Sequence, residues 1–162
     1  MPEVVLLVHN IRSTHNVGAL FRTADGLGVS HLYISGYTPY PITPGDERLP
    51  HIRNKIAQQI NKTALGAEST VAFTYTAEPQ IAELKSKGFT IVGLEQAKNS
   101  INLKDYIPDD SNIALIVGEE VNGIDSDLLS VCDVLLEIPM RGTKESYNVS
   151  VATGMALFQL LG

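Results

Sequence analysis

The sequence predicts an α/β fold, a parallel sheet covered by helices on both faces, and two observations lead to this prediction. Helical patterns lie between most of the short apolar runs, and such alternation is typical of a parallel sheet, because each crossover places a helix against it. The chain has 162 residues and is 44% hydrophobic and 19% charged, which suits one compact domain over 1–162. Apolar runs of strand length occur at 4–8, 31–35, 71–74, 90–94, 113–117 and 134–138.

The first third of the chain predicts a strand, a helix, a second strand and a long loop. The opening run lacks a basic leader and a cleavage site, so it predicts a strand and not a signal peptide. Asn16 is a good N-cap for a helix over 17–27, which the strand at 31–35 follows. The segment 36–50, GYTPYPITPGDERLP, holds four prolines and two glycines. It predicts an irregular loop of a length that is often functional.

The later helices are expected near 53–64, 79–87, 126–131 and 149–161. The last of them carries Thr153 and Gln159 as almost its only polar residues, so it must be covered on more than one side. Two explanations are open from the pattern alone. The helix is either buried wholly within its own domain, or it covers a partner.

Composition excludes several kinds of protein. The single Cys132 excludes an intrachain disulfide and a cysteine-based zinc site and indicates a reducing compartment, so we expect a cytoplasmic protein. No apolar run approaches the roughly 18 residues that span a bilayer, so no membrane contact is expected. The four histidines show no metal-ligand spacing, and we expect no metal; they are His9, His15, His31 and His51.

The net charge of −6 argues mildly against a nucleic-acid partner. The charge is unevenly distributed, because residues 1–62 carry six Lys/Arg against four Asp/Glu and residues 63–162 carry six against fourteen. The basic residues of the first part crowd the segment 48–62, which is either a solvated helix face or an RNA contact. They are Arg48, Arg53, Lys55 and Lys62, together with His51.

Three loops at expected carboxyl ends of strands have unusual composition, and ligands bind at such ends in open parallel sheets. The first contains Asn16, then Gly18, which permits close approach, and Arg22 one helical turn later. The second, GEEVNGI at 118–124, brackets two carboxylates with Gly118 and Gly123. It lacks the Lys-Ser or Lys-Thr of a phosphate-binding P-loop.

The third loop begins where Pro139 ends the strand at 134–138, because proline cannot donate to a ladder. Ser146, Asn148 and Ser150 are all good caps for the last helix, although only one of them can be its N-cap. The surplus of polar groups predicts a ligand at this loop.

Together the three loops resemble the SpoU/TrmH family of RNA ribose 2'-O-methyltransferases, within the SPOUT superfamily. The matching motifs are NIRSTHNVGALFRTADGLGV, ALIVGEEVNGI and IPMRGTKESYNVSVATGMAL. The resemblance implies a C-terminal deep trefoil knot, an S-adenosylmethionine site formed by the knotted loops, and a homodimer in which the last helix packs against the partner. It also implies methylation of a ribose 2'-hydroxyl in tRNA or rRNA. We expect residues 1–162 to form a single SpoU-type methyltransferase domain with no separate RNA-binding domain.

The resemblance assigns roles residue by residue. Asn16 and Arg22 match the polar positions of the first motif that act on the ribose and its phosphate. Glu120 matches the second motif, and Ser146 and Asn148 match the polar pair near the reacting centre, where they also border the cofactor. The remaining matches belong to the cofactor pocket: Gly118, Gly123, and the backbone of Ile138 and Met140.

Two roles are open for Arg22, the base or the group that fixes the phosphate. Arginine is a poor proton acceptor, so we favour the second. Two residues depart from the family pattern: Glu119 stands where Asn, Ser or Arg is usual, and Tyr147 where Leu is usual. Glu119 could repel an approaching phosphate or lie outward.

The resemblance does not indicate which RNA or nucleotide is modified, or how an acidic chain binds RNA. The main alternative is a non-catalytic RNA- or nucleotide-binding protein that keeps the same fold and dimer. An α/β enzyme that uses another nucleotide is a second alternative.

Overall fold

A single seven-stranded parallel sheet organises the computed structural model, which describes residues 1–162. The strands stand in the order β3-β2-β1-β6-β4-β7-β5, and every neighbouring pair is parallel. This confirms the predicted α/β class. The strands are β1 (Val4–His9), β2 (His31–Ser35), β3 (Phe73–Thr76), β4 (Thr90–Leu94), β5 (Ile101–Asn102), β6 (Ile113–Val117) and β7 (Val134–Glu137).

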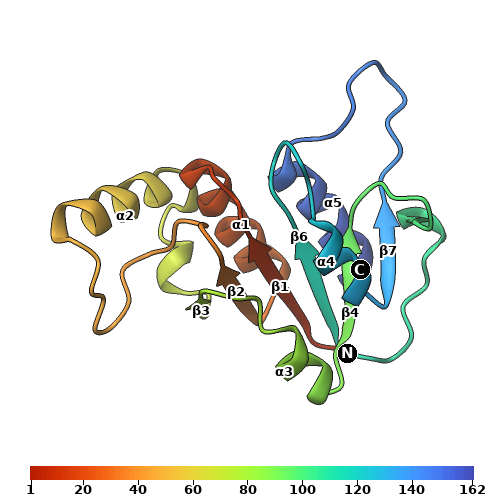
Figure 1. Ribbon diagram of the computed structural model, residues 1–162, viewed down its shortest axis with the longest axis horizontal. Helices are drawn as coiled ribbons and strands as arrows, with labels where there is room; N and C mark the ends of the chain where they lie inside the picture. The colour runs from red at the N-terminus through yellow and green to blue at the C-terminus, as the bar shows by residue number, and fades with distance from the viewer.

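Helices cover both faces of the sheet, as predicted (Figure 1). One face carries α1 (Thr14–Leu27), α2 (Pro50–Ala64) and α5 (Val149–Leu161), and the other carries α3 (Ile81–Ser86) and α4 (Ser126–Val131). Two short 3₁₀ helices, η1 (Ala67–Ser69) and η2 (Leu103–Asp105), complete the set. None of the helices combines the length and the apolar composition that a bilayer crossing requires.

The sequence of the central strand β1 is a continuous apolar run because both of its faces are buried. Leu6 and Val8 pack in the core on the α1 side, while Val5 and Leu7 pack in the core beneath α3 and α4. A strand buried on both faces needs apolar residues at every position. Burial of each apolar side chain of this size stabilises the folded state by about 1.5–3 kcal/mol relative to leaving it exposed to water.

Two predicted starts of elements are wrong for local reasons, and one strand was not predicted. Helix α1 begins at Thr14, because the hydroxyl of Ser13 accepts from the backbone N–H of Asn16 at 3.1 Å, so Ser13 and not Asn16 is the N-cap. The third strand starts two residues later than predicted, since Val71 still donates to Ala67 in the turn that closes η1. The edge strand β5 was not predicted, because two residues show no period.

Candidate active site

A cavity of about 290 Å³ opens at the carboxyl ends of β4, β6 and β7. Sequence reasoning predicted a ligand site at this edge, and the structure brings the second and third loops together there. The wall is formed by Leu94, Glu95, Gln96, Val117, Gly118, Glu119, Glu120, Val121, Asn122, Gly123, Glu137, Ile138, Glu145, Ser146, Tyr147, Val149 and Ala152.

The turn after β6 requires glycine at two positions. The backbones of Glu119 and Gly123 exchange two hydrogen bonds, of 3.1 and 2.8 Å. A Cβ atom at Gly118 would lie 2.6 Å from the carbonyl of Gly123, and Gly123 has a φ of 69° with a site for Cβ that overlaps the carboxylate of Glu95. Both positions therefore require glycine.

Glu119 neither points outward nor presents a free charge. Its carboxylate accepts hydrogen bonds from the backbone N–H groups of Val121 at 3.2 Å and Asn122 at 2.7 Å, and its side chain is 7% exposed. The guanidinium of Arg12 lies 3.9 Å away. The unusual carboxylate thus stabilises its own turn. Neither alternative drawn from the sequence, a free charge that repels phosphate or an outward side chain, describes its position.

Glu120 joins the first and second loops. Its carboxylate accepts from the backbone N–H groups of Arg12 and Ser13, both at 3.1 Å, and from the side-chain amide of Asn16 at 3.2 Å. It thus places a negative charge at the N-terminus of α1, where the helix dipole favours one. Burial opposes ionisation, but these hydrogen bonds together hold the pKa of Glu120 below its ordinary value.

Asn148 connects the third loop to this network. Its amide donates to the side-chain oxygen of Asn16 at 3.3 Å, so Asn148, Asn16 and Glu120 form a continuous hydrogen-bonded chain across the three loops. Asn148 is also the N-cap of α5, because its side-chain oxygen accepts from the backbone N–H of Ser150 at 2.9 Å. Ser146 lines the cavity and makes no hydrogen bond within the chain, which leaves its hydroxyl free for a ligand.

Four predicted site residues are not part of the cavity wall: Asn16, Arg22, Met140 and Asn148. Asn16 is hydrogen-bonded to the wall residue Glu120, and Asn148 to Asn16. Arg22 is exposed on α1 and makes no hydrogen bond or ion pair within the chain. Met140 follows β7 but is not part of the wall, whereas Ile138 is, with its carbonyl 3.4 Å from the side-chain amide of Gln96. Gly18 packs against α2 rather than a ligand, since a Cβ there would overlap the carbonyl of Ile60.

Sequence reasoning missed the loop after β4. Glu95 accepts from the backbone N–H of Ile124 at 2.9 Å and of Gln96 at 3.0 Å, and so connects this loop to the turn after β6. Its position directly after a predicted strand was the available signal. The cavity wall holds no Lys, Arg or His, but it does hold five glutamates: Glu95, Glu119, Glu120, Glu137 and Glu145.

The wall thus combines these carboxylates with apolar side chains, which include Leu94, Val117, Ile138 and Val149. Such a cavity suits a ligand with a cationic centre and a flat apolar group. No three His, Cys, Asp or Glu side chains in the chain are grouped so as to hold a metal ion.

Residues 3–158 match the model of the SpoU rRNA Methylase family. The chain belongs to this family. The predicted resemblance is therefore confirmed, and the loops that carry the three SpoU motifs are the loops of the hydrogen-bonded chain described above.

Curated relatives of this SpoU chain include two enzymes that are named for their RNA substrates. The tRNA (guanosine(18)-2'-O)-methyltransferase of Aquifex aeolicus is 29% identical over 161 residues, which cover 97% of this chain and 68% of that enzyme. The 23S rRNA (guanosine-2'-O-)-methyltransferase RlmB of Neisseria meningitidis is 33% identical over 158 residues, 96% of this chain. The chain spans only 57% of the length of the Neisseria enzyme.

Solved structures agree with the fold. The A. aeolicus TrmH/SpoU tRNA modifying enzyme matches with a TM-score of 0.79 at 26% identity, covering 98% of this chain and 74% of that one. An AdoMet-bound rRNA methyltransferase from Sinorhizobium meliloti matches with a TM-score of 0.81 at 21% identity, over 97% of this chain and 55% of that one.

Proposed function

We propose that this protein transfers a methyl group from S-adenosylmethionine to a ribose 2'-hydroxyl of tRNA or rRNA. The observation that carries the proposal is the chain of hydrogen bonds from Asn148 through Asn16 to Glu120 beside a carboxylate-lined cavity, in a SpoU-family fold. The activities for which the Aquifex and Neisseria relatives are named support the same reaction.

The cavity fits the cofactor by charge and by size. When bound, S-adenosylmethionine supplies a methyl group activated by a positive sulfonium. The wall has five carboxylates and no basic side chain, and its volume of about 290 Å³ lies near the lower end of ordinary ligand pockets. Gly118, Gly123 and the backbone of Ile138 would hold the cofactor, with the apolar wall against its adenine.

The polar residues take substrate roles in this proposal. Ser146, whose hydroxyl has no partner in the chain, and Asn148 would border the reacting centre, and Glu120 would keep Asn16 oriented. Arg22 is exposed and unpaired, and we assign it to an RNA phosphate rather than to proton removal, because arginine keeps its proton. Met140 would contact the cofactor through its backbone only if the loop after β7 closes over the cavity.

We infer that the C-terminal part of the chain is tied in the family's deep trefoil knot. The sheet order supports this, because the connection from β4 to β6 runs through β5, on the far side of β7. The later strand β7 thus enters between segments that are already connected. Mechanical stretching from both ends should leave a residual shortening, and extension to the full contour length would contradict the knot.

We also propose a homodimer that uses α5. Val151, Met155 and Phe158 recur at i, i+4 and i+7 and remain 49%, 38% and 71% exposed, so α5 is not wholly buried within its own domain. Its opposite side packs in the core through Ala156, Leu157 and Leu160. We further propose that the protein acts in the cytoplasm, where its proposed RNA substrates would be modified, and that residues 1–162 act as one methyltransferase domain.

Titration calorimetry tests the cofactor assignment. We expect S-adenosylmethionine and S-adenosylhomocysteine to bind, and absence of heat with both at high protein concentration would contradict it. Cofactor binding without methyl transfer to any RNA would instead favour the non-catalytic RNA-binding alternative.

A further inference from the structure

Helix α2 is cationic in an acidic chain. The protein has 18 Asp/Glu against 12 Lys/Arg, yet the sequence of α2, PHIRNKIAQQINKTA, contains Arg53, Lys55 and Lys62 and no acidic residue. Among the helices, this excess of positive charge is confined to α2. No residue of α2 belongs to the cavity wall, so the positive charge of this helix is not part of the candidate site.

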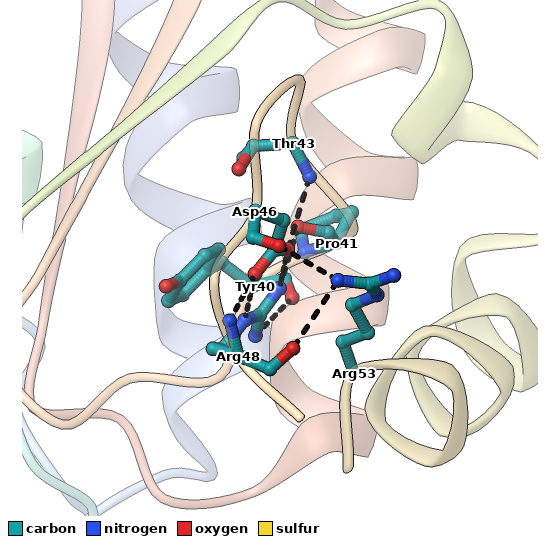
Figure 2. A network of polar contacts seen from close by, with 6 residues as sticks. All are labelled: Tyr40, Pro41, Thr43, Asp46, Arg48 and Arg53. Atoms are coloured by element: carbon teal, nitrogen blue, oxygen red, sulfur yellow. Dashed lines mark hydrogen bonds and ion pairs between the residues drawn. The ribbon is translucent and has the colours of Figure 1, made fainter. Parts of the chain in front are cut away.

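The structure divides the basic residues near α2 into two groups. Arg48 donates to the carboxylate of Asp46 from Nε at 3.0 Å and Nη2 at 2.6 Å, and to the carbonyls of Tyr40 and Pro41. Arg53 donates from Nη1 to the carbonyl of Asp46 at 2.7 Å (Figure 2). These two arginines therefore hydrogen-bond within the chain and order the loop at 36–49.

Stacking fixes the same loop to the sheet. The guanidinium of Arg48 lies 3.6 Å from the ring centroid of Tyr40, and the Tyr40 ring stacks on that of Tyr75 in β3 with centroids 3.9 Å apart. The hydrogen bonds from Arg48 hold the pKa of Asp46 well below its ordinary value, so this ion pair persists at neutral pH. The loop therefore holds the amino end of α2 in one place.

The second group faces solvent. His51, Lys55, Gln58 and Lys62 recur at helical spacing on the side of α2 opposite the buried Ile60 and are all exposed. None of their side chains makes a hydrogen bond or ion pair within the chain. Lys85 and Lys87, in contrast, pair with Asp133 and Glu83.

The exposed stripe leads toward the candidate site. The hydroxyl of Thr63, next to Lys62, donates to the carbonyl of His15 at 2.7 Å. The following residue, Asn16, bonds to Glu120. The carboxyl end of α2 is thus packed on the first turn of α1, which carries Asn16.

We propose that the stripe His51, Lys55, Gln58 and Lys62 is the docking surface for the phosphate backbone of the RNA substrate. The inference rests on the proposed function. It explains how an acidic chain holds a polyanion: Lys55 and Lys62 on α2 have no partner in the chain, while none of the five carboxylates of the cavity wall belongs to α2. From His51 to Lys62 the helix rises about 16 Å, so the stripe is long enough for several phosphates.

The test compares two double variants that each remove two positive charges. Lys55→Ala/Lys62→Ala changes the stripe, and Lys87→Ala/Lys104→Ala, both exposed lysines outside α2, is the control. Binding to total bacterial tRNA and to total bacterial rRNA is measured separately by fluorescence anisotropy at several salt concentrations. Cofactor binding to each variant is measured by calorimetry.

The stripe variant should bind RNA about tenfold more weakly, with a log–log salt slope shallower by about 1–2, because each phosphate contact contributes about 0.7–0.9 to that slope. Cofactor affinity should be unchanged, and the control variant should bind RNA as the parent does. Equal loss in both variants, or none in the stripe variant, would overturn the inference while leaving the proposed function intact.

Two further outcomes separate the assignments. A parent protein that binds neither RNA would overturn both the docking surface and the proposed function. The parent protein could instead bind polyglutamate as tightly as RNA, with the polyglutamate binding lost in the stripe variant. That result would show that α2 is a site for acidic polypeptides and would contradict the RNA assignment.

Discussion

Individual side chains at this site act mainly through the backbone they hold. Glu119, Glu120 and Glu95 each accept two or more hydrogen bonds from backbone N–H groups of neighbouring turns. The free groups, by contrast, are the hydroxyl of Ser146 and the guanidinium of Arg22. We therefore expect substitutions of the first group to change stability, and substitutions of the second to change chemistry.

Arg22→Ala should leave S-adenosylmethionine affinity nearly unchanged while methyl transfer falls by about 100-fold or more, the scale of losing a positioned catalytic group. Arg22→Lys should restore little, because lysine cannot present two parallel donors to a phosphate. Calorimetry and a methyl-transfer assay on the same samples check both expectations. Transfer at the parent rate by the alanine variant would end the assignment, and equal loss of cofactor binding would make Arg22 structural.

Glu120→Gln should lower the free energy of unfolding by about 1–2 kcal/mol at pH 7, because the amide cannot accept all the bonds that the carboxylate accepts. The folded-state pKa of Glu120 lies below its ordinary value, so its contribution is complete above that ordinary value and is lost as the pH falls through the folded value. The difference between parent and variant should therefore shrink in acid. Urea unfolding across this range checks it, with Glu145→Gln, a cavity carboxylate without hydrogen bonds in the chain, as control. Equal losses in the two variants would contradict this role.

At the scale of elements, the contact between α1 and α2 depends on the missing side chain of Gly18. Gly18→Ala would place a Cβ against the Thr63 hydroxyl and the Ile60 carbonyl and 2.9 Å from the Ala64 nitrogen, and should cost about 1–3 kcal/mol of unfolding free energy. Gly26→Ala in the same helix meets nothing within 4 Å and should stabilise by up to about 1 kcal/mol. Thermal or urea unfolding that gave both variants the same sign would refute the contact.

Several strands and helices could be predicted from the sequence, and others could not. β2, β4 and β6 follow directly from short apolar runs, and α5 from an apolar segment after good caps. The start of α1 did not follow, because Ser13 and Asn16 are both good caps and only the hydrogen bond decides between them. Likewise Glu95 carries no local motif, since its partner Ile124 lies 29 residues away.

For the molecule as a whole, the exposed apolar stripe on α5 predicts a dimer. Phe158→Glu should shift the protein to a monomer near 17.5 kDa, because the new charge would be unpaired in the interface. Phe158 is 71% exposed in one chain, so the fold should survive, unlike a change at the fully buried Ala156. Sedimentation at micromolar concentration measures the mass, and Ile107→Glu, at an exposed apolar residue outside α5, is the control. A parent that sediments only as a monomer would refute the dimer.

Methyl transfer to RNA can be measured directly by incubating the protein with tritiated-methyl S-adenosylmethionine and total tRNA or rRNA, and then digesting the RNA to nucleosides. We expect label in 2'-O-methylated nucleosides from one of the two RNA pools, strongly reduced with Arg22→Ala. Label on a base, or none in either pool from protein that binds the cofactor, would contradict this expectation.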